Sequence, residues 1–359
     1  MSTFEIKKKD REFLDNLKQK EKTEVLVNRM VREKYIPNLA EIRFLLSLEE
    51  ELAGLVYDAA HQVQLDNFED KLQIRGILEF SNICEKNCKY CGIRKNNKYI
   101  SRYHLSLDEI LQIAREIEKT DITTIVLQSG ESRYYPLSSL ISIIKAIKEN
   151  TSLALTLSTG VHTREEIEKL AEAGCDRFLL RFETSDQKIF SEMHPDDNLL
   201  TRLNCLENLK RSGIVPGSGF MIGLPGSNLS TVARDLLFLT GLNLPMAGIG
   251  PYIPVNPKEV IASPATLNTD VYFLAVSLLR LMNPQMHIPA TTAFDNLVPG
   301  SRILLLNRGC NVFMPSFTRD ELRKKYSIYQ RRETTCNTKD KLENLHEKLQ
   351  KKKPEVNLP

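Results

Sequence analysis

The stretch "RGILEFSNICEKNCKYC" (residues 75–91) joins a short apolar run to three closely spaced cysteines. The run "RGILEF" (75–80) has the length and composition of a buried strand. Cys84, Cys88 and Cys91 begin four residues after it, with the spacing C-x3-C-x2-C. The cysteines are therefore expected in the loop that leaves the carboxyl end of a first strand.

Apolar and β-branched runs of the same kind recur along the chain, with helical patterns between them. They occupy 75–80, 123–129, 153–159, 177–183, 217–223, 247–253, 287–293 and 310–315. Strands that alternate with helices favour parallel pairing and right-handed crossovers. Eight such units predict an α/β fold, a complete (β/α)8 barrel of the TIM type. A half-open barrel or a doubly wound sheet is the alternative. In a barrel, the loop with the cysteines would lie at the mouth where active sites are built.

The segments between the strands carry signals for the ends of helices. Ser106 with Glu109, and Thr163 with Glu166, have the spacing of capping boxes, in which side chains satisfy first-turn backbone donors. Glycines stand where helix C-terminal caps are favoured, at Gly174 and Gly213.

The two ends of the chain differ from its centre. Residues 1–74 alternate charged and apolar positions at helical spacing and predict an N-terminal helical extension. The barrel is expected over 75–318, followed by a C-terminal extension over 319–359. In that extension "KDKLENLHEKLQKKK" (339–353) predicts a solvated helix.

Composition limits the class of protein. Lys and Arg number 49 against 46 acidic residues, so the net charge of +3 is too small to indicate nucleic acid. No apolar run approaches the roughly 20 residues needed to span a bilayer. Met1 leads directly into charged sequence, without the pattern of a signal peptide. Seven unevenly spread cysteines favour a reducing compartment. The expectation is a soluble cytoplasmic protein that binds neither nucleic acid nor membrane.

The three clustered cysteines have a specific chemical use. A short loop lets three thiolates converge on one iron–sulfur cluster, which normally takes four cysteine ligands. Three ligands leave one iron free to bind a small molecule. A structural zinc site, which usually takes four ligands in two pairs, is one alternative. A disulfide with a spare thiol is another, and it fits neither the spacing nor the compartment. Three further cysteines in apolar patterns are expected in the core: Cys175, Cys205 and Cys310.

This motif, with Tyr90 before the last cysteine, resembles the radical S-adenosylmethionine (SAM) superfamily. The resemblance implies one 4Fe–4S cluster on Cys84, Cys88 and Cys91. It also implies that the amine and carboxylate of SAM chelate the open iron. One electron from the cluster then splits the sulfonium of SAM to give a 5′-deoxyadenosyl radical.

The superfamily resemblance implies cofactor contacts at other strand ends. "QSGE" (128–131) resembles the turn that receives the methionine amine of SAM, although a plain strand-exit turn is the alternative. Arg202 suits the carboxylate through a charge-assisted contact, whereas a salt bridge between Glu183 and Arg202 is the structural alternative. The expected cofactor-binding set is Tyr90, Gln128, Ser129, Gly130, Glu131, Thr156, Glu183, Arg202, Met221 and Ile249.

Longer phrases narrow the resemblance. "EFSNICEKNCKYCGIRKNN", "AGCDRFLLRFET", "MIGLPG" and "PATTAFDNLVPGSR" resemble the HydE family of FeFe-hydrogenase maturases, within the biotin-synthase-like group. The likeness spans residues 40–335. It implies a role in making the two-iron part of the hydrogenase H-cluster and its dithiomethylamine bridge, from a small anionic organometallic or amino-acid-derived substrate. Other hydrogenase maturases and a reductant such as ferredoxin or flavodoxin are the implied partners.

The same resemblance implies which residues act on the substrate. Arg181, Thr291 and Thr292 correspond to residues of an anion-binding cavity inside the barrel, and Tyr326 and Tyr329 to tyrosines that close it. Two adjacent threonines at a strand end can instead cap a helix.

One departure from the family concerns a second cluster. Some members bind an accessory cluster near the C-terminus through C-x7-C-x2-C, whereas here Cys336 stands without a partner and Lys339 replaces one. A single cluster is therefore expected. Two other functions stay open: a different biotin-synthase-like radical reaction, such as an amino-acid rearrangement, and a non-catalytic iron–sulfur scaffold.

Overall fold

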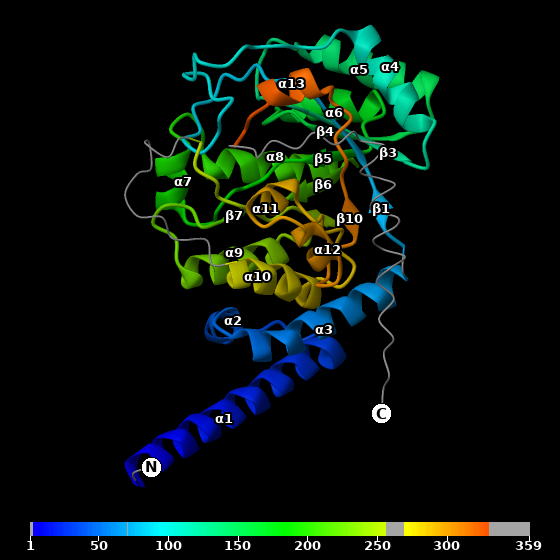
Figure 1. Cartoon of the computed structure of the whole chain (residues 1–359). Helices are drawn as coiled ribbons and strands as arrows, with labels where there is room; N and C mark the ends of the chain where they lie inside the picture. The colour runs from blue at the N-terminus through cyan, green and yellow to red at the C-terminus, as the bar shows by residue number, and fades with distance from the viewer. Residues whose placement is uncertain (1–2, 70, 256–268, 330–359) are drawn as a thin grey trace.

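Parallel strands form the centre of the molecule (Figure 1). The computed structural model describes residues 3–69, 71–255 and 269–329. Its main sheet has six strands in the order β2-β3-β4-β5-β6-β8, every adjacent pair parallel. They span Gly76–Ser81, Thr124–Ser129, Ala154–Ser158, Arg177–Leu179, Val215–Ser218 and Met246–Ala247. The chain is thus an α/β protein with a parallel sheet, as the alternating pattern predicts.

Shorter parallel pairings continue beyond this sheet. β1 (Gln73–Ile74) pairs with β10 (Val312–Phe313), and β7 (Met221–Ile222) pairs with β9 (Gly250–Pro251). Single parallel bridges join Met246 to His287, Pro289 to Val312, and Ile77 to Ser316. The runs expected as strands at 287–293 and 310–315 are therefore much shorter than predicted. Prolines within both runs remove backbone N–H donors, which limits ladder length.

Two other expected strands, 217–223 and 247–253, are each divided into two short pieces. Between the pieces, the backbones at Gly219 and Gly248 approach so closely that a Cβ on Gly219 would overlap the carbonyl of Gly248. Only glycine at position 219 allows this contact.

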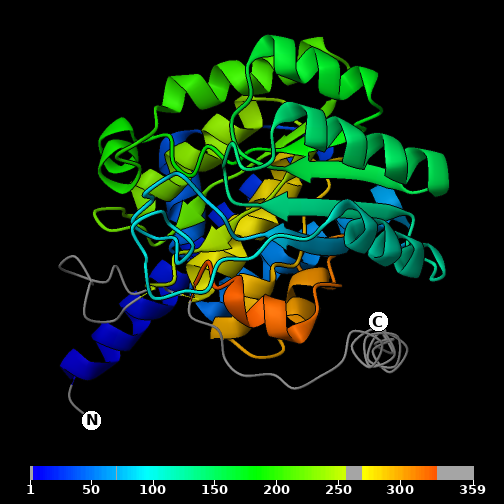
Figure 2. The same cartoon turned by 90° about the horizontal axis from the view of Figure 1, so that it is seen from above.

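Amphipathic helices cover the outer side of the strands (Figure 2). The main ones are α4 (Leu107–Glu118), α5 (Leu137–Asn150), α6 (Arg164–Glu172), α8 (Leu199–Arg211) and α9 (Leu229–Gly241). The capping boxes predicted at Ser106 and Thr163 are both present. Both predicted C-terminal glycines have left-handed φ angles, +103° at Gly174 and +82° at Gly213. These local signals were sufficient because capping depends on neighbours in sequence.

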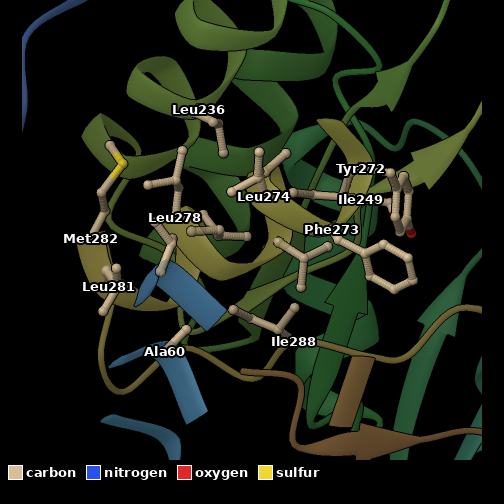
Figure 3. Close-up of a cluster of buried hydrophobic side chains, with 14 of the residues drawn as sticks. Ala60, Leu236, Ile249, Tyr272, Phe273, Leu274, Leu278, Leu281, Met282 and Ile288 are labelled. Carbon is tan, nitrogen blue, oxygen red and sulfur yellow. The ribbon is translucent and has the colours of Figure 1, made fainter. Parts of the chain in front are cut away.

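A buried helix packs against both the N-terminal helices and the helices that cover the sheet. α10 (Thr269–Met282) is buried at every residue from Val271 to Met282. It packs on α3 (Glu50–Phe68) on one side and on α9 on the other, and the cluster in Figure 3 includes Ala60, Leu236 and Leu278. Burying such a leucine contributes about 2 kcal/mol. Since α10 is enclosed, most of its residues are apolar, and its buried Arg280 donates to the Gly309 carbonyl at 2.7 Å.

The remaining elements complete the path of the chain. α1 (Thr3–Glu33), α2 (Leu39–Leu46) and α3 precede the sheet, and Figure 1 shows α1 extending away from the strands. Four further helices are short: α7 (Gln187–Met193), α11 (Thr292–Leu297), α12 (Ser301–Leu306) and α13 (Asp320–Lys325).

Other expectations concern the core, the C-terminus and membranes. The three cysteines expected in the core are buried there: Cys175, Cys205 and Cys310. Cys336, Lys339 and the helix expected at 339–353 lie outside the described residues. None of the described helices has both the length and the apolar character needed to cross a membrane.

Candidate active site at the carboxyl ends of the strands

The three clustered cysteines lie together on the loop between β2 and α4. Cys84, Cys88 and Cys91 are free, half-buried thiols, and the Cys91 amide donates to the Cys88 carbonyl at 3.0 Å. Burial raises the pKa of all three, to about 12 for Cys88. For Cys91, repulsion from the other two thiolates adds to the effect of burial. The thiols are therefore within electrostatic reach of one another.

This donor set fits an iron–sulfur cluster held by three cysteines. A site for a single metal ion, such as structural zinc, is a different arrangement. In the described part of the chain, no three His, Cys, Asp or Glu side chains are placed to hold one metal ion. Burial makes it unfavourable to ionise these thiols. Bound iron would stabilise the thiolates, because metal binding releases the thiol proton. The β3 exit lies against the loop: a Cβ on Gly130 would come within 2.7 Å of the Cys84 Cβ. The turn expected to receive SAM is thus beside the cysteines.

Tyr90 connects the cysteine loop to the end of β5. Its hydroxyl lies 3.3 Å from Oε1 of Glu183 and 2.8 Å from Nε2 of His194. The His194 ring stacks on Phe190 with centroids 4.2 Å apart, and burial lowers its pKa to about 4. His194 is therefore neutral near pH 7. It was missed in the sequence, where it appears as an ordinary residue at the end of a helix.

Glu183 adopts a backbone conformation that is unusual for a non-glycine residue. Its φ is +67°, and its side chain is buried. Oε2 lies 2.9 Å from the terminal nitrogen NH2 of Arg181, which also donates to the Phe220 carbonyl at 2.9 Å. The Nε atom of Arg181 is buried without a hydrogen-bond partner in the described structure. Strained backbone and an unsatisfied donor at the same place are typical of ligand sites.

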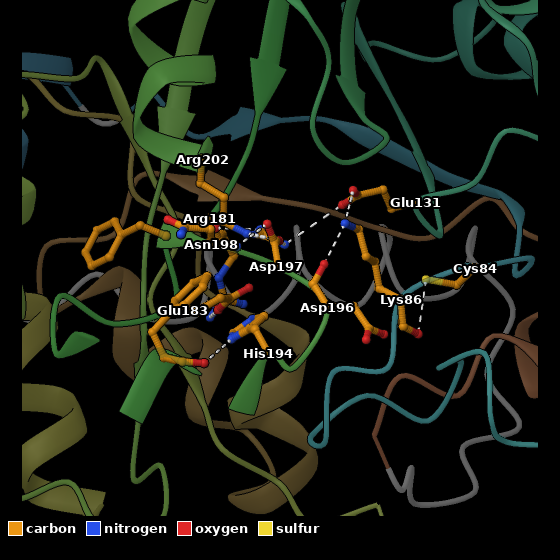
Figure 4. A network of polar contacts seen from close by, with 12 residues as sticks. Cys84, Lys86, Glu131, Arg181, Glu183, His194, Asp196, Asp197, Asn198 and Arg202 are labelled. Atoms are coloured by element: carbon orange, nitrogen blue, oxygen red, sulfur yellow. Dashed lines mark hydrogen bonds and ion pairs between the residues drawn. The ribbon is translucent and has the colours of Figure 1, made fainter. Parts of the chain in front are cut away.

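Arg202 is held by a carboxylate that the sequence analysis did not single out. Its Nε and NH2 atoms lie 2.7 and 2.6 Å from Oδ2 of Asp197, and its NH1 donates to the Arg181 carbonyl at 2.9 Å (Figure 4). The expected alternative, a bridge between Glu183 and Arg202, is replaced by the pairs Glu183–Arg181 and Arg202–Asp197. Burial lowers the pKa of Arg202, but the surrounding anionic groups outweigh this and raise it overall.

Glu131 continues the same network toward the cysteines. Its carboxylate lies 3.2 Å from Nζ of Lys86 and 3.9 Å from Arg202. Figure 4 shows Cys84, Lys86, Glu131 and Arg202 in one connected region. Burial raises the pKa of Glu131, an effect that both cations oppose. Charges of both signs thus line the side of the mouth nearest the cysteine loop.

The other expected cofactor residues occupy strand ends around this network. The Thr156 hydroxyl is buried without a hydrogen-bond partner in the described structure, so it can bond to a ligand. Ser129 donates to the Gly130 carbonyl at 2.8 Å. The remaining three lie on β3, on β7 and just before β9: Gln128, Met221 and Ile249.

The residues expected to contact the substrate fall into two groups. Thr291 lies 2.8 Å from the Tyr272 hydroxyl, and the charges of Arg181 and Tyr329 both affect the pKa of Tyr272. Thr291 precedes α11 without capping it through its side chain, and Thr292 begins that helix. Arg181, Thr291 and Tyr329 thus lie within interaction range of Tyr272, which donates to the Ile249 carbonyl at 2.7 Å.

Tyr326 belongs to the other group. It packs in a cluster with Ile93 and Tyr103, to which Cys84 and Cys91 also belong, and it interacts with Gln128. It is therefore on the cysteine side of the site. Tyr272 was missed because its helical segment carries only the apolar signal of a core helix. Asp197 had a weak signal in the polar stretch "HPDDN" (194–198).

Comparisons with known proteins agree with this geometry. Residues 78–239 match the Radical SAM superfamily. The chain is 41% identical over 274 residues to the FeFe hydrogenase maturase subunit HydE of Thermotoga maritima, covering 76% of this chain and 78% of that protein. It is 28% identical over 239 residues to biotin synthase of Leptospira interrogans, covering 64% and 66%. In structure it resembles the FeFe-hydrogenase maturase HydG of Carboxydothermus hydrogenoformans, with a TM-score of 0.78, 24% identity, and coverage of 96% and 82%.

Proposed function

Because this chain belongs to the HydE family of the radical SAM superfamily, we propose that it cleaves SAM reductively to help assemble the two-iron part of the FeFe-hydrogenase H-cluster. The observation that carries this proposal is the placement of three free thiols of a C-x3-C-x2-C loop beside one connected network of Glu131, Glu183 and Arg202. An iron–sulfur scaffold without catalysis would not need that network.

The chain's own residues then have distinct tasks. Cys84, Cys88 and Cys91 would hold a 4Fe–4S cluster, which would supply one-electron chemistry to bound SAM. Arg202 presents guanidinium N–H groups to the carboxylate of SAM, and Asp197 fixes its orientation. The backbone at Gly130 and the carboxylate of Glu131 receive the SAM amine. The unpartnered hydroxyl of Thr156 donates to the cofactor.

The rest of the expected cofactor set completes the pocket for SAM. Glu183 and Tyr90 are linked through the Tyr90 hydroxyl and line the adenosine side. The remaining contacts come from Gln128, Ser129, Met221 and Ile249. These positions surround the cofactor with both polar and apolar groups, which excludes water from the reacting atoms.

We further propose that the strands close into a complete (β/α)8 barrel over residues 75–318. The parallel bridges at His287, Pro289 and Ser316 support closure, since they continue the pairing from β8 toward β2. Residues 1–74 would form the N-terminal helical extension and 319–359 the C-terminal extension. This barrel would enclose the site. Because the cluster must be reduced to react, we place the protein in the cytoplasm.

The substrate would be a small anion bound deeper than SAM. Arg181 supports this, because its buried Nε lacks a hydrogen-bond partner in the described structure, and a bound anion would satisfy that donor. Thr291 and Thr292 would supply further donors, and Tyr329 would close that side. Tyr326 would separate the substrate from the cysteine loop. An anionic organometallic or amino-acid-derived substrate fits these groups, and a ferredoxin or flavodoxin and the other maturases are the partners.

The test uses anaerobically reconstituted protein in two assays. Dithionite-reduced protein with SAM should release 5′-deoxyadenosine, and addition to a maturation mixture with the other maturases should activate FeFe-hydrogenase. If no 5′-deoxyadenosine forms while the cluster is present, the scaffold alternative is correct. If SAM is cleaved but hydrogenase stays inactive, the chain performs another reaction of the biotin-synthase-like group.

A further inference from the structure

The two ends of the cysteine loop are joined by one side chain, Arg102. Its NH1 atom donates to the carbonyls of Asn82 at 2.6 Å and Ile93 at 2.7 Å. Its NH2 atom donates to the carbonyls of Arg94 at 2.7 Å and Asn97 at 3.2 Å. Asn82 lies two residues before the first cysteine of the motif, and Ile93 lies two residues after the last. The guanidinium therefore bridges the start and the end of the segment that carries all three thiols.

These bonds matter because the loop has little regular structure. Asn82 and Ile93 are buried, and a buried backbone carbonyl needs a hydrogen-bond partner. Bonds from a charged donor are stronger than those between neutral groups. The planar fork of arginine can reach several acceptors at fixed angles, whereas a lysine ammonium is a single point. The backbone on both sides of the cysteines is thus held by the side chain of Arg102.

The loop is secured further at Asn82. Its side-chain Nδ2 donates to the carbonyls of Ser101 at 2.9 Å and Lys325 at 2.8 Å, and its Oδ1 accepts from the Tyr103 amide at 2.7 Å. Arg102 therefore stands in a segment that is itself anchored to the loop entry. This double anchoring gives the guanidinium a fixed position.

Arg102 also places a positive charge near the thiols. In the described structure every hydrogen bond of its guanidinium goes to a main-chain carbonyl. Burial lowers the pKa of Arg102, and attraction to the thiolates of Cys84 and Cys91 partly offsets this effect. A cation at this position would stabilise added negative charge on a cluster bound by those cysteines.

We propose that Arg102 is a positioning residue for the cluster: it folds the cysteine loop before iron binds and keeps a fixed positive charge beside the bound cluster. This inference rests on the proposed function only in its use of Cys84, Cys88 and Cys91 as ligands. Its first half concerns the protein without iron, so it can be tested separately.

The test compares the parent with Arg102→Lys and Arg102→Gln, and uses Arg115→Gln as the control. Arg115 lies on the surface of α4, where it bonds to the side chain of Asn150. Three quantities are measured: hydrogen exchange of amides 84–98 in iron-free protein, iron bound per chain after anaerobic reconstitution, and the midpoint potential of the cluster.

Both Arg102 variants should exchange these loop amides about tenfold faster than the parent, or more, while amides of β3 and β4 are unchanged. Arg102→Gln should have a more negative midpoint potential than Arg102→Lys, which keeps the charge. The control should match the parent throughout. If the loop amides of Arg102→Gln exchange at the parent's rate, Arg102 does not fold the loop before iron binds. If Arg102→Gln and Arg102→Lys have equal midpoint potentials, the positive charge of Arg102 does not act on the cluster. If the parent itself binds no iron, the proposed function fails instead.

Discussion

The Oδ1 atom of Asp235 accepts hydrogen bonds from both the amide and the hydroxyl of Ser185, each at 2.6 Å. The other carboxylate oxygen accepts from the Thr184 hydroxyl at 3.2 Å. Asp235 lies on α9 and is 1% exposed. The turn that it holds directly follows Glu183, the residue with the left-handed φ of +67°. Asp235 therefore anchors the turn that directly follows Glu183.

Asp235 should make the protein less stable as the pH rises from 4 to 7. Burial raises its pKa from 3.8 to about 6, so the folded chain binds a proton that the unfolded chain has already lost. The unfolding free energy should fall by about 3 kcal/mol over this range. Asp235→Asn removes this dependence. Urea unfolding of iron-free protein is measured at pH 4.5 and 7.5. The unfolding free energy of Asp235→Asn, relative to that of the parent, should be higher at pH 7.5 than at pH 4.5. Identical pH dependence of the two proteins would exclude the ionisation as the cause.

His194 should have the opposite effect in nearly the same pH range. Burial lowers its pKa from 6.5 to about 4, so the unfolded chain binds a proton that the folded chain does not. The stability due to neutral His194 is therefore complete above pH 6.5 and is lost as the pH falls toward 4, by about 3 kcal/mol. His194→Gln should resist acid better than the parent. Urea unfolding at pH 4.5 and 7.5 tests this prediction. An equal loss of unfolding free energy at pH 4.5 in the parent and in His194→Gln would count against it.

The cysteine motif should account for all cluster binding. Replacing Cys84, Cys88 and Cys91 together by alanine should abolish iron and sulfide uptake, because no other described cysteine lies in this loop. The matched control is Cys205→Ala, which removes a buried thiol of the core at a cost of about 1 kcal/mol. Iron and sulfide per chain after anaerobic reconstitution are the readout. A complete cluster in the triple variant would refute the assignment.

Asp197 should be needed to keep Arg202 oriented for SAM. Its Oδ2 atom lies 2.6 Å from the NH2 atom of Arg202, and both side chains are nearly fully buried. Asp197→Asn leaves the guanidinium without its closest anion, a change that costs about 3–5 kcal/mol for buried pairs. SAM affinity of the reconstituted protein should fall at least tenfold, with iron content unchanged. Asp196→Asn is the control, since its side chain is exposed. Equal losses of SAM affinity in Asp197→Asn and Asp196→Asn would mean that SAM binding depends on the negative charge of this segment and not on the ion pair between Asp197 and Arg202.

Features of the site that depend on local sequence were predictable, whereas those that depend on long-range contacts were not. The cysteine loop and the capping box at Ser106 are set by spacing along the chain, and the structure contains both. The partner of Arg202 could not be read from the sequence, because Glu183 and Asp197 are both acidic and near it in the chain. Only the path of the turn after β5 decides between them.

The lengths of the late strands could not be predicted from the apolar runs alone. Pro289 lies inside a run of apolar residues that otherwise predicts a strand, and its missing N–H leaves a single bridge. The surroundings of Tyr326 were also not evident in the sequence: it directly follows α13 and packs on Ile93 beside the cysteine loop, and its role in closing the substrate cavity stays a prediction. That helix has the weak pattern of a short, charged segment, so its direction depends on tertiary packing.

Arg181 provides the test that separates the substrate site from the cofactor site. Its NH2 atom contacts both the Phe220 carbonyl and Glu183, while its Nε atom is buried without a hydrogen-bond partner in the described structure. Arg181→Leu removes the donor for an anion, so it should keep the cluster and SAM cleavage but lose hydrogenase activation. Arg181→Lys keeps a positive charge beside Glu183 but loses the planar guanidinium group. Hydrogenase activation should therefore fall at least tenfold in this variant.

The two readouts for Arg181 are SAM affinity and hydrogenase activation in the reconstituted maturation mixture. Arg211→Leu, which removes an exposed arginine of α8 paired with Glu207, controls for the loss of one positive charge. Full activation by Arg181→Leu would remove this residue from the anion site. A collapse of SAM affinity in Arg181→Leu but not in Arg181→Lys would show that its charge serves Glu183, and hence that Arg181 belongs with the cofactor. Unchanged SAM affinity with lost activation in both variants is the outcome we expect, because the unsatisfied Nε donor is the atom that an anionic substrate would engage.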